Sequence, residues 1–230
     1  MRFTKEIEEK VIELKKIIDN SNPFGTVTYQ DSKNLKELYN IVLPFLEDNE
    51  INHDELIKLT NILIYIAIKY DRMKRPGQSI RIYYNILNCF SILFNKYKEK
   101  YMGNSSLFNT NLNYINIIRK TIEARKSFYN WNLDEIVSIC KTFLNEEEIE
   151  KYIYLESKSI SITLNDPIEM TDEYLNIIDE VEPKINEEYD KLPNLGFGMI
   201  HFYWEIKKRI LEEYGIKWRS PKELNNAIFD

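Results

Sequence analysis

The chain has 230 residues, 43% of them hydrophobic and 30% charged, which is typical of a globular protein that buries a core without disulfides or metals. Its net charge of −6 argues against nucleic acid as a partner, because proteins that bind phosphate backbones are usually basic. The longest apolar run, Ile62 to Ile68, is far shorter than the ~20 residues that cross a membrane, and the charged N-terminus does not resemble a signal peptide. We therefore expect a cytoplasmic protein that binds neither nucleic acid nor membrane.

Apolar residues spaced by three and four predict helices along the first half of the chain. The expected helices span about 3–18, 32–47, 52–75, 78–101 and 107–129, with a loop at 102–106. Pro44 should kink the second helix or begin its end. Asn52 with Glu55 is the pattern of a capping box and should open the third helix, which Pro76 and Gly77 should stop.

The same capping pattern recurs in the second half, where each instance predicts a helix start. The pairs are Asn132 with Glu135, Asn145 with Glu148, and Ser220 with Glu223, the last with Pro221 at the first helical position. Further helices are expected from about Asp172, interrupted near Pro183, and over about 199–214. Residues 157–164 alternate in polarity and are either a short strand or a frayed helix end.

The segment from Thr60 to Leu93 carries the most specific pattern, two amphipathic helices joined by a tight Arg-Pro-Gly turn. Large, small and aromatic residues stand where a tetratricopeptide repeat places them: Leu63, Ile66, Ala67 and Tyr70 in the first helix, Ser79 and Tyr83 in the second. The segment therefore resembles one such unit, although Ile86 and Ser91 stand where the repeat prefers Ala and Pro. The pattern does not recur at the roughly 34-residue period of the family, so no regular array is expected.

These patterns predict an all-α fold of about nine helices. Two arrangements fit them, an irregular helical-repeat (TPR-like) stack and an antiparallel helical bundle. We expect one all-helical domain over residues 1–230, and any internal boundary near 103–107 or 165–170.

Charged and aromatic residues gather at the turn of this hairpin. Four basic residues against the single acid Asp71 give a local charge of +3 on an acidic chain. Arginines on a rigid turn suit carboxylates or phosphates, because the planar guanidinium donates two hydrogen bonds at once. The candidate binding residues are Tyr70, Arg72, Arg75, Tyr83 and Tyr84. The alternative is that Asp71 pairs with an arginine and the rest is a solvated turn.

Charge is distributed unevenly near the C-terminus. Residues 166–190 hold ten acids and one base, net −9, whereas residues 191–222 hold seven bases and three acids, net +4. Such neighbouring blocks usually neutralise each other across adjacent helices. The alternative is an acidic docking face for a basic partner, with Asp179, Glu180 and Glu182 as its candidate residues.

No pattern in the chain indicates chemistry. Cys89 and Cys140 lie in helical segments and are expected to be buried, reduced thiols. His201 and Glu205 share a helix face, but a metal site needs more ligands than these. The sequence has no phosphate-binding glycine loop and no catalytic signature. We therefore expect no metal, no cofactor and no catalytic residue, and thus no enzyme.

The sequence favours a non-catalytic interaction module that binds a protein or peptide in a groove between helices. Two alternatives stay open. One is an immunity- or antitoxin-like protein that neutralises a basic protein through its acidic block. The other is a binder of, or enzyme acting on, a phosphate-bearing small molecule held by the arginine–tyrosine cluster.

Overall fold

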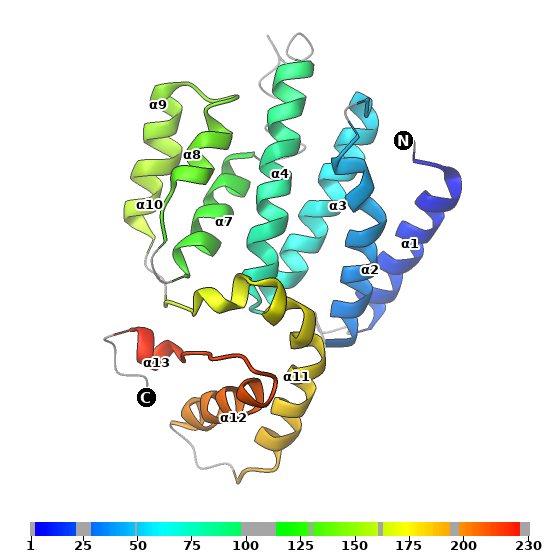
Figure 1. Cartoon of the computed structure of the whole chain (residues 1–230). Coiled ribbons are helices and arrows are strands. Elements are labelled where there is room, and N and C mark those ends of the chain that lie inside the picture. Colours follow the sequence, from blue (N-terminus) through cyan, green and yellow to red (C-terminus); the bar gives the residue numbers. More distant parts are fainter. Residues whose placement is uncertain are drawn as a thin grey trace. The chain divides into compact units, whose positions relative to one another are not determined.

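The computed structural model describes residues 3–21, 29–48, 50–97, 114–128, 131–160, 163–193 and 198–225 (Figure 1). Apart from one isolated bridge, the regular structure in these ranges is helical, which confirms the predicted all-α fold class. No helix in these ranges is both long and apolar enough to cross a bilayer. The chain divides into two compact units. Unit 1 comprises Met1–Arg125 and Asn132–Ser161, and unit 2 comprises Lys126–Trp131 and Ile162–Asp230.

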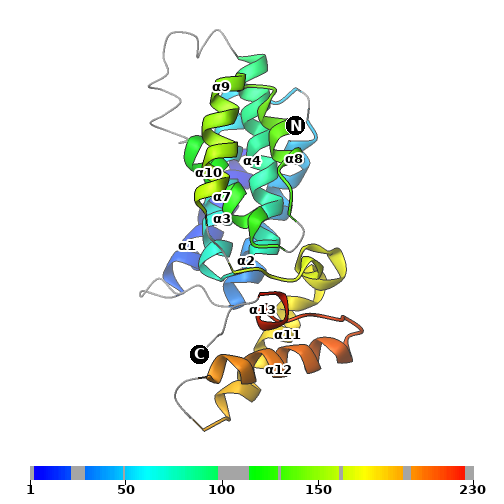
Figure 2. The same cartoon turned by 90° about the vertical axis from the view of Figure 1, so that its left-hand side faces the viewer.

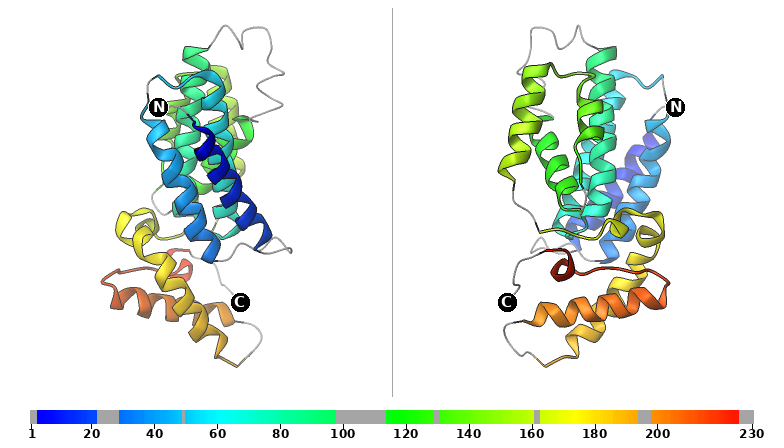
Figure 3. Two further views of the ribbon diagram at one scale, coloured as in Figure 1. Left: turned by 90° about the vertical axis from the view of Figure 1, so that its right-hand side faces the viewer. Right: turned by 60° about the vertical axis from the view of Figure 1, so that its left-hand side comes forward.

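Unit 1 consists of helices that pack largely in chain order. They are α1 (Lys5–Asn20), α2 (Tyr29–Leu46), α3 (His53–Arg72), α4 (Pro76–Lys96), α7 (Tyr114–Lys126), α8 (Asp134–Cys140), α9 (Glu146–Ile149), the π-helix η1 (Glu150–Leu155) and α10 (Glu156–Ser159). α1 packs on α2, α2 on α3, α3 on α4 and α4 on α8. Figures 1 and 3 show α1 to α4 side by side, each reversing the direction of the one before.

The apolar stripes predicted from the sequence form the core of unit 1. In α1 the buried residues are Val11, Leu14 and Ile18, which recur at the spacing of one helix face. α3 and α4 make the most extensive helix pair, and the small side chains of Ala67 and Ser79 are both fully buried there. Small residues let two helices approach closely, so the hairpin is held by direct packing of the helices.

Two of the predicted caps in unit 1 are confirmed and one is wrong. The Asn52 side chain accepts hydrogen bonds from the first turn of α3, and Asn145 with Glu148 forms a complete capping box at α9. Asn132 does not cap α8, because this helix begins at Asp134 and the carbonyl of Leu133 accepts its first helical bond. The cap position therefore falls on an apolar residue whose side chain makes no capping bond.

Helix boundaries in unit 1 differ from the sequence predictions by a few residues. Pro76 does not merely stop α3 but is the first residue of α4, a position whose missing N–H costs no helical bond. α2 continues two residues past Pro44 to Leu46. Residues 102–106, expected to form a loop, and 107–113, expected to be helical, lie outside the described residues.

The segment 157–164 contains no strand among its described residues. Ser157 and Ser159 belong to α10, and Ile160 then turns to an extended conformation. Of the two predicted possibilities, the helix end is therefore the correct one for residues 157–160. The hydroxyls of Ser157 and Ser159 donate to the carbonyls of Tyr154 and Glu156, as serines near a helix end often do.

Unit 2 is built around two crossing helices, α11 (Asp172–Asp190) and α12 (Met199–Glu213) (Figure 2). The 3₁₀ helix η2 (Pro167–Met170) precedes them and packs on α11, and the short helix α13 (Pro221–Leu224) follows. The predicted capping box of Ser220 and Glu223 opens α13. The core joins both long helices to the chain after α12 through Tyr174, Ile178, Val181, Ile185, Ile210, Leu211, Ile216 and Trp218.

The predicted interruption of α11 at Pro183 does not occur. The helix runs unbroken from Asp172 to Asp190 with this proline in its interior. Proline removes one helical donor and crowds the preceding turn. Val181 and Ile185, on either side, are fully buried in the core, so tertiary packing offsets the local penalty.

Unit 2 also takes in the short segment that follows α7. The N–H of Asn165 donates to the carbonyl of Ser127 at 2.5 Å, and Phe128 forms an isolated parallel bridge with Asn165. Nearby, the side-chain amide of Asn225 pairs with both the N–H and the carbonyl of Leu164. These bonds tie together three pieces of chain that are far apart in the sequence.

Candidate functional site

The turn between α3 and α4, which holds the predicted binding residues, is a Schellman motif. The N–H of Arg75 donates to the carbonyl of Tyr70 at 3.1 Å, and the N–H of Lys74 donates to the carbonyl of Asp71 at 2.9 Å. Lys74 has φ 56° and thus occupies the left-handed position that glycine usually takes. The turn fixes the directions of the side chains around it.

Most of the predicted binding residues point into the core of unit 1. Tyr70, Arg75 and Tyr83 are only 5%, 5% and 1% exposed. Tyr84 is half-buried, and its hydroxyl lies near Glu135 and Arg125. Of the five, Arg72 alone is exposed. The three buried side chains cannot contact a partner in this conformation, which leaves Arg72 as the exposed member of the cluster.

Two polar side chains at this turn have hydrogen-bond partners within unit 1. Arg75 Nη1 donates to Ser32 Oγ at 2.7 Å, and the Tyr83 hydroxyl donates to Asp71 Oδ2 at 2.5 Å. The expected pairing of Asp71 with an arginine is therefore replaced by a bond to tyrosine. Burial raises the pKa of Asp71, although the hydrogen bond from Tyr83 acts in the opposite direction.

The predicted acidic docking residues lie on α11. Glu180 is the most exposed of them, and its Oε1 accepts hydrogen bonds from Tyr214 at 2.5 Å and from Lys184 at 2.9 Å. The bonds from Tyr214 and Lys184 lower the pKa of Glu180. Asp179 and Glu182 are half-buried. The three carboxylates therefore do not form a uniformly free acidic surface.

Ion pairs join part of the acidic block of the C-terminal region to part of the basic block. Ion pairs that join the two blocks connect Asp166 with Arg219, Glu169 with Lys207, Glu187 with Lys191, and Glu188 with Arg209. The pair of Glu169 and Lys207 is the most deeply buried, with side chains 9% and 13% exposed. These ion pairs lie within unit 2 and offset part of the charge difference between the acidic and the basic block.

Both cysteines are buried, at 1% and 0% exposed, and burial raises the pKa of Cys89 and of Cys140 to about 12. Both are therefore thiols at neutral pH and not nucleophilic thiolates. The His201 ring packs edge-on against Trp204, with 5.2 Å between the ring centroids. Within the ranges that the structure describes, no three His, Cys, Asp or Glu side chains converge as metal ligands would.

Unit 2 contains an open pocket of about 590 Å³, which the sequence did not predict. Its walls come from η2 and its flanking residues, from α12, and from the chain after α12. The lining residues are Asp166, Pro167, Ile168, Thr171, Lys208, Glu212, Ile216, Lys217, Trp218 and Arg219. Ile168, Ile216 and Trp218 provide apolar surface, whereas most of the remainder is charged.

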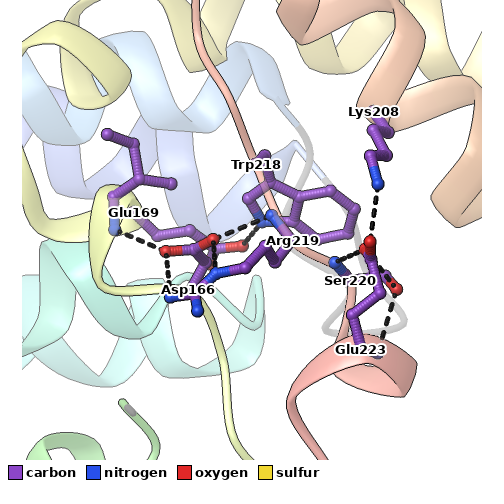
Figure 4. Close-up of polar contacts among 8 residues, drawn as sticks. Asp166, Glu169, Lys208, Trp218, Arg219, Ser220 and Glu223 are labelled. Carbon is purple, nitrogen blue, oxygen red and sulfur yellow. Dashed lines mark hydrogen bonds and ion pairs between the residues drawn. The ribbon is translucent and has the colours of Figure 1, made fainter. Parts of the chain in front are cut away.

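A buried polar cluster supports one wall of this pocket (Figure 4). Glu169 Oε1 accepts a hydrogen bond from Trp218 Nε1 at 2.6 Å and from Lys207 Nζ at 2.9 Å. Lys207 Nζ also lies 4.3 Å from the centroid of the Trp218 ring, a cation–π contact. Burial alone would lower the pKa of Lys207, but the Glu169 carboxylate raises it overall, so the lysine stays charged.

Asp166 holds the two halves of the pocket wall together (Figure 4). Its Oδ1 caps η2 by accepting from the N–H of Ile168 at 3.1 Å. Its Oδ2 accepts from the N–H of Arg219 at 2.8 Å and from Arg219 Nε at 3.0 Å. One buried carboxylate thus bridges η2 and the chain after α12, which fixes their separation.

The chain after α12 has the burial pattern of a strand. Ile216, Trp218 and Ser220 are buried, whereas Lys217 and Arg219 between them are exposed. Alternation with a period of two is the mark of an extended chain with one face on a core. The same alternation of apolar and charged residues is present in the sequence, directly after Gly215, and was the available signal for this part of the pocket.

At the rim, two opposite charges remain available. Glu212 and Lys217 are exposed, and neither has an ion-pair partner among the residues that the structure describes. Lys208, by contrast, binds Glu223 at 2.6 Å, and the hydrogen bond from Lys208 lowers the pKa of Glu223. The pocket therefore presents one free acid and one free base around an apolar centre. No protein-family model, curated protein or solved structure matches the chain.

Proposed function

We propose that the protein is a non-catalytic interaction module, and that it binds a peptide segment of a partner protein in the pocket of unit 2. The observation that carries this proposal is the make-up of the pocket: an open, partly apolar trough of about 590 Å³ with complementary charges at its rim. Peptide-binding sites combine an apolar anchor point with polar groups that fix orientation. The cytoplasm is the proposed location.

The test begins with a phage-displayed library of random dodecapeptides selected on the full-length protein. A selected peptide is then synthesised, and its affinity is measured by isothermal titration calorimetry. The double variant Glu212→Lys/Lys217→Glu exchanges the two rim charges without altering the net charge. We expect it to weaken binding about tenfold or more, because each reversal places like charges opposite each other.

The matched control exchanges a charge pair on α1. Lys5 and Glu9 are 89% and 67% exposed and lie in unit 1, so Lys5→Glu/Glu9→Lys also keeps the net charge and should leave the affinity unchanged. Failure to select any peptide, or equal affinity of both double variants, would contradict the proposed function. A peptide lost on Arg72→Glu instead would move the binding site to the hairpin turn.

A neutralising protein that covers a basic partner is the second candidate. The exposed carboxylate of Glu180 supports it, although bonds to Lys184 and Tyr214 already occupy that carboxylate. This candidate predicts tight, strongly salt-dependent binding of a basic protein. Reversing the charges of Asp179, Glu180 and Glu182 together should abolish such binding, and weak binding that ignores salt would count against it.

A phosphate-bearing small ligand is the third candidate, because Arg72 and Lys74 are both exposed at the hairpin turn. A thermal-shift screen with nucleotides and sugar phosphates tests it, since a ligand present at 100 times its Kd stabilises the folded state by about 2.7 kcal/mol. A melting temperature that stays constant across the screen would remove this candidate.

A further inference from the structure

In the extended chain after α12, some backbone N–H and C=O groups form hydrogen bonds and others do not. The N–H of Ile216 donates to the carbonyl of Leu211, and that of Ser220 to Glu223 Oε2. The carbonyl of Ile216 and both backbone groups of Trp218 have no hydrogen bond to any residue that the structure describes. Ile216 and Trp218 thus leave one donor and two acceptors unpaired between them.

The unpaired groups of Ile216 and Trp218 lie along one edge of the extended chain. The backbone groups of Lys217, on the opposite edge, also have no hydrogen bond to a residue that the structure describes, but Lys217 is exposed and water reaches them. In such a chain the backbone groups of successive residues point to opposite edges, and those of every second residue share an edge. Trp218 therefore shares an edge with Ile216 and Ser220. The N–H of Arg219 points to the opposite edge, where it donates to Asp166.

The two residues that carry these groups are largely buried. Ile216 and Trp218 are 6% and 3% exposed, and both line the pocket. Buried backbone N–H and C=O groups in native proteins are paired in more than nine cases out of ten. A row of unpaired groups at a pocket wall is therefore suited to pairing with the main chain of a second polypeptide.

We propose that the partner peptide binds as an added β-strand on the edge of Ile216 and Trp218. A carbonyl of the peptide accepts from the N–H of Trp218, and two of its N–H groups donate to the carbonyls of Trp218 and Ile216. This inference rests on the proposed function and specifies how the peptide is held. An apolar peptide side chain packs near Ile168, a basic one lies opposite Glu212 and an acidic one opposite Lys217.

The experiment is an N-methylation scan of the peptide selected on the full-length protein. Each peptide N–H in turn is replaced by N–CH₃, which removes one donor and leaves every side chain in place. Only the two N–H groups that face the edge should matter. Methylation of those two, which are two residues apart, should weaken binding about tenfold or more each, whereas methylation of the residue between them should have little effect.

Amide exchange provides a second readout on the protein itself. In ¹⁵N-labelled full-length protein, the Trp218 amide should exchange at least about tenfold more slowly when the peptide is bound. The Lys217 amide, which lies on the opposite edge, is the internal control and should change little.

The outcomes separate this inference from the proposed function. A peptide that is weakened by the Glu212/Lys217 exchange, yet shows a uniform N-methylation profile and no protection of Trp218, would overturn strand addition and leave the interaction module standing. If no peptide binds at the pocket, both proposals are wrong. An alternating profile together with protection of Trp218 would establish the added strand.

Discussion

Lys74 and Gly215 occupy the same position, the first residue after the cap, at the C-terminal ends of two helices. One end has a lysine there and the other has a glycine. Both have positive φ, 56° and 79°, and both follow a helix that ends in a Schellman motif. In the second motif the N–H of Ile216 donates to the carbonyl of Leu211, and the two side chains belong to one buried apolar cluster, a contact that often accompanies this motif. The left-handed conformation costs an L-residue roughly 1–2 kcal/mol, a penalty that glycine avoids.

Substitutions at these two positions should change the stability of the protein in opposite directions. Lys74→Gly should stabilise the protein and Gly215→Ala should destabilise it, each by about 1 kcal/mol. A side chain at 215 would meet no atom within 4 Å, so the second effect includes no steric clash. Urea unfolding monitored by circular dichroism measures both. Lys74→Ala, which keeps an L-residue at the position, is the control and should not be more stable than the native protein.

Asp71 predicts a pH effect on stability. Burial raises the pKa of this carboxyl in the folded state, so folding favours its protonated form. The stabilising contribution is thus fully present below the unfolded pKa of about 3.9 and is lost as pH rises through the higher folded value. Asp71→Asn stays neutral and still accepts a bond from Tyr83. The variant should be more stable than the native protein at pH 7, with the difference shrinking towards pH 3.

The free energies of unfolding of the native protein and of Asp71→Asn, measured at several pH values, test this prediction. A variant that is less stable by the same amount at pH 7 and pH 3 would show that the carboxylate makes no pH-dependent contribution. Tyr83→Phe is the complementary change. It leaves a largely buried carboxylate without its donor and should cost about 1–3 kcal/mol at neutral pH.

At the scale of the element, prolines at helical positions have different consequences. Pro221 occupies the first position of α13, where the missing N–H is harmless, whereas Pro183 lies inside α11 and Pro44 near the end of α2. Relative to alanine, an interior proline costs a helix about 3 kcal/mol. α11 persists because its apolar face is buried on both sides of the proline.

Pro183→Ala should therefore stabilise unit 2. We expect a gain of about 1–3 kcal/mol, below the full penalty because the surrounding helix is already adapted to proline. Thermal unfolding compares this variant with Pro221→Ala, which should bring no gain because proline is favoured where α13 begins. An equal gain from both variants would show that the effect does not come from the interior position of Pro183 in α11.

Elements were predictable wherever the determining chemistry is local. The capping boxes at Asn145 and Ser220 need only four consecutive residues, and both were found from the sequence. The predicted cap at Asn132 was wrong. The chain before it, including Phe128, is held by residues near Asn165, so local chemistry alone does not decide where α8 begins. The predicted interruption at Pro183 was wrong because packing of the apolar face of α11 outweighs the local penalty of proline. The sequence shows that penalty but not the packing.

The candidate site was less predictable than the helices. Spacing places Tyr70 and Tyr83 on the facing sides of a hairpin, but the same spacing serves a buried core and an exposed groove equally well. The pocket of unit 2 unites η2 with a chain about 50 residues later, through Asp166 and Arg219, and no short motif encodes such a meeting. Its one local signal is the alternation after Gly215.

At the scale of the whole molecule, unit 2 consists of two separate segments of the sequence. A variant of Glu169 tests whether the two segments unfold together. Glu169→Gln leaves the charge of Lys207 buried without its carboxylate, which should cost about 3–5 kcal/mol. Hydrogen exchange measured by mass spectrometry should then be faster in residues 163–225 and also in 126–131, while α1 to α4 are little changed. Faster exchange confined to residues 163–225 would show that segment 126–131 does not depend on the rest of the unit.

The placement of Phe128 in unit 2 imposes an order of events during synthesis. The ring is fully buried, yet its bridge partner Asn165 is translated about 37 residues later. At 5–20 residues per second that interval is ~2–7 s, far longer than a helix needs to form. A nascent chain that already carries α1 to α4 therefore exists for seconds before the bridge between Phe128 and Asn165 can form.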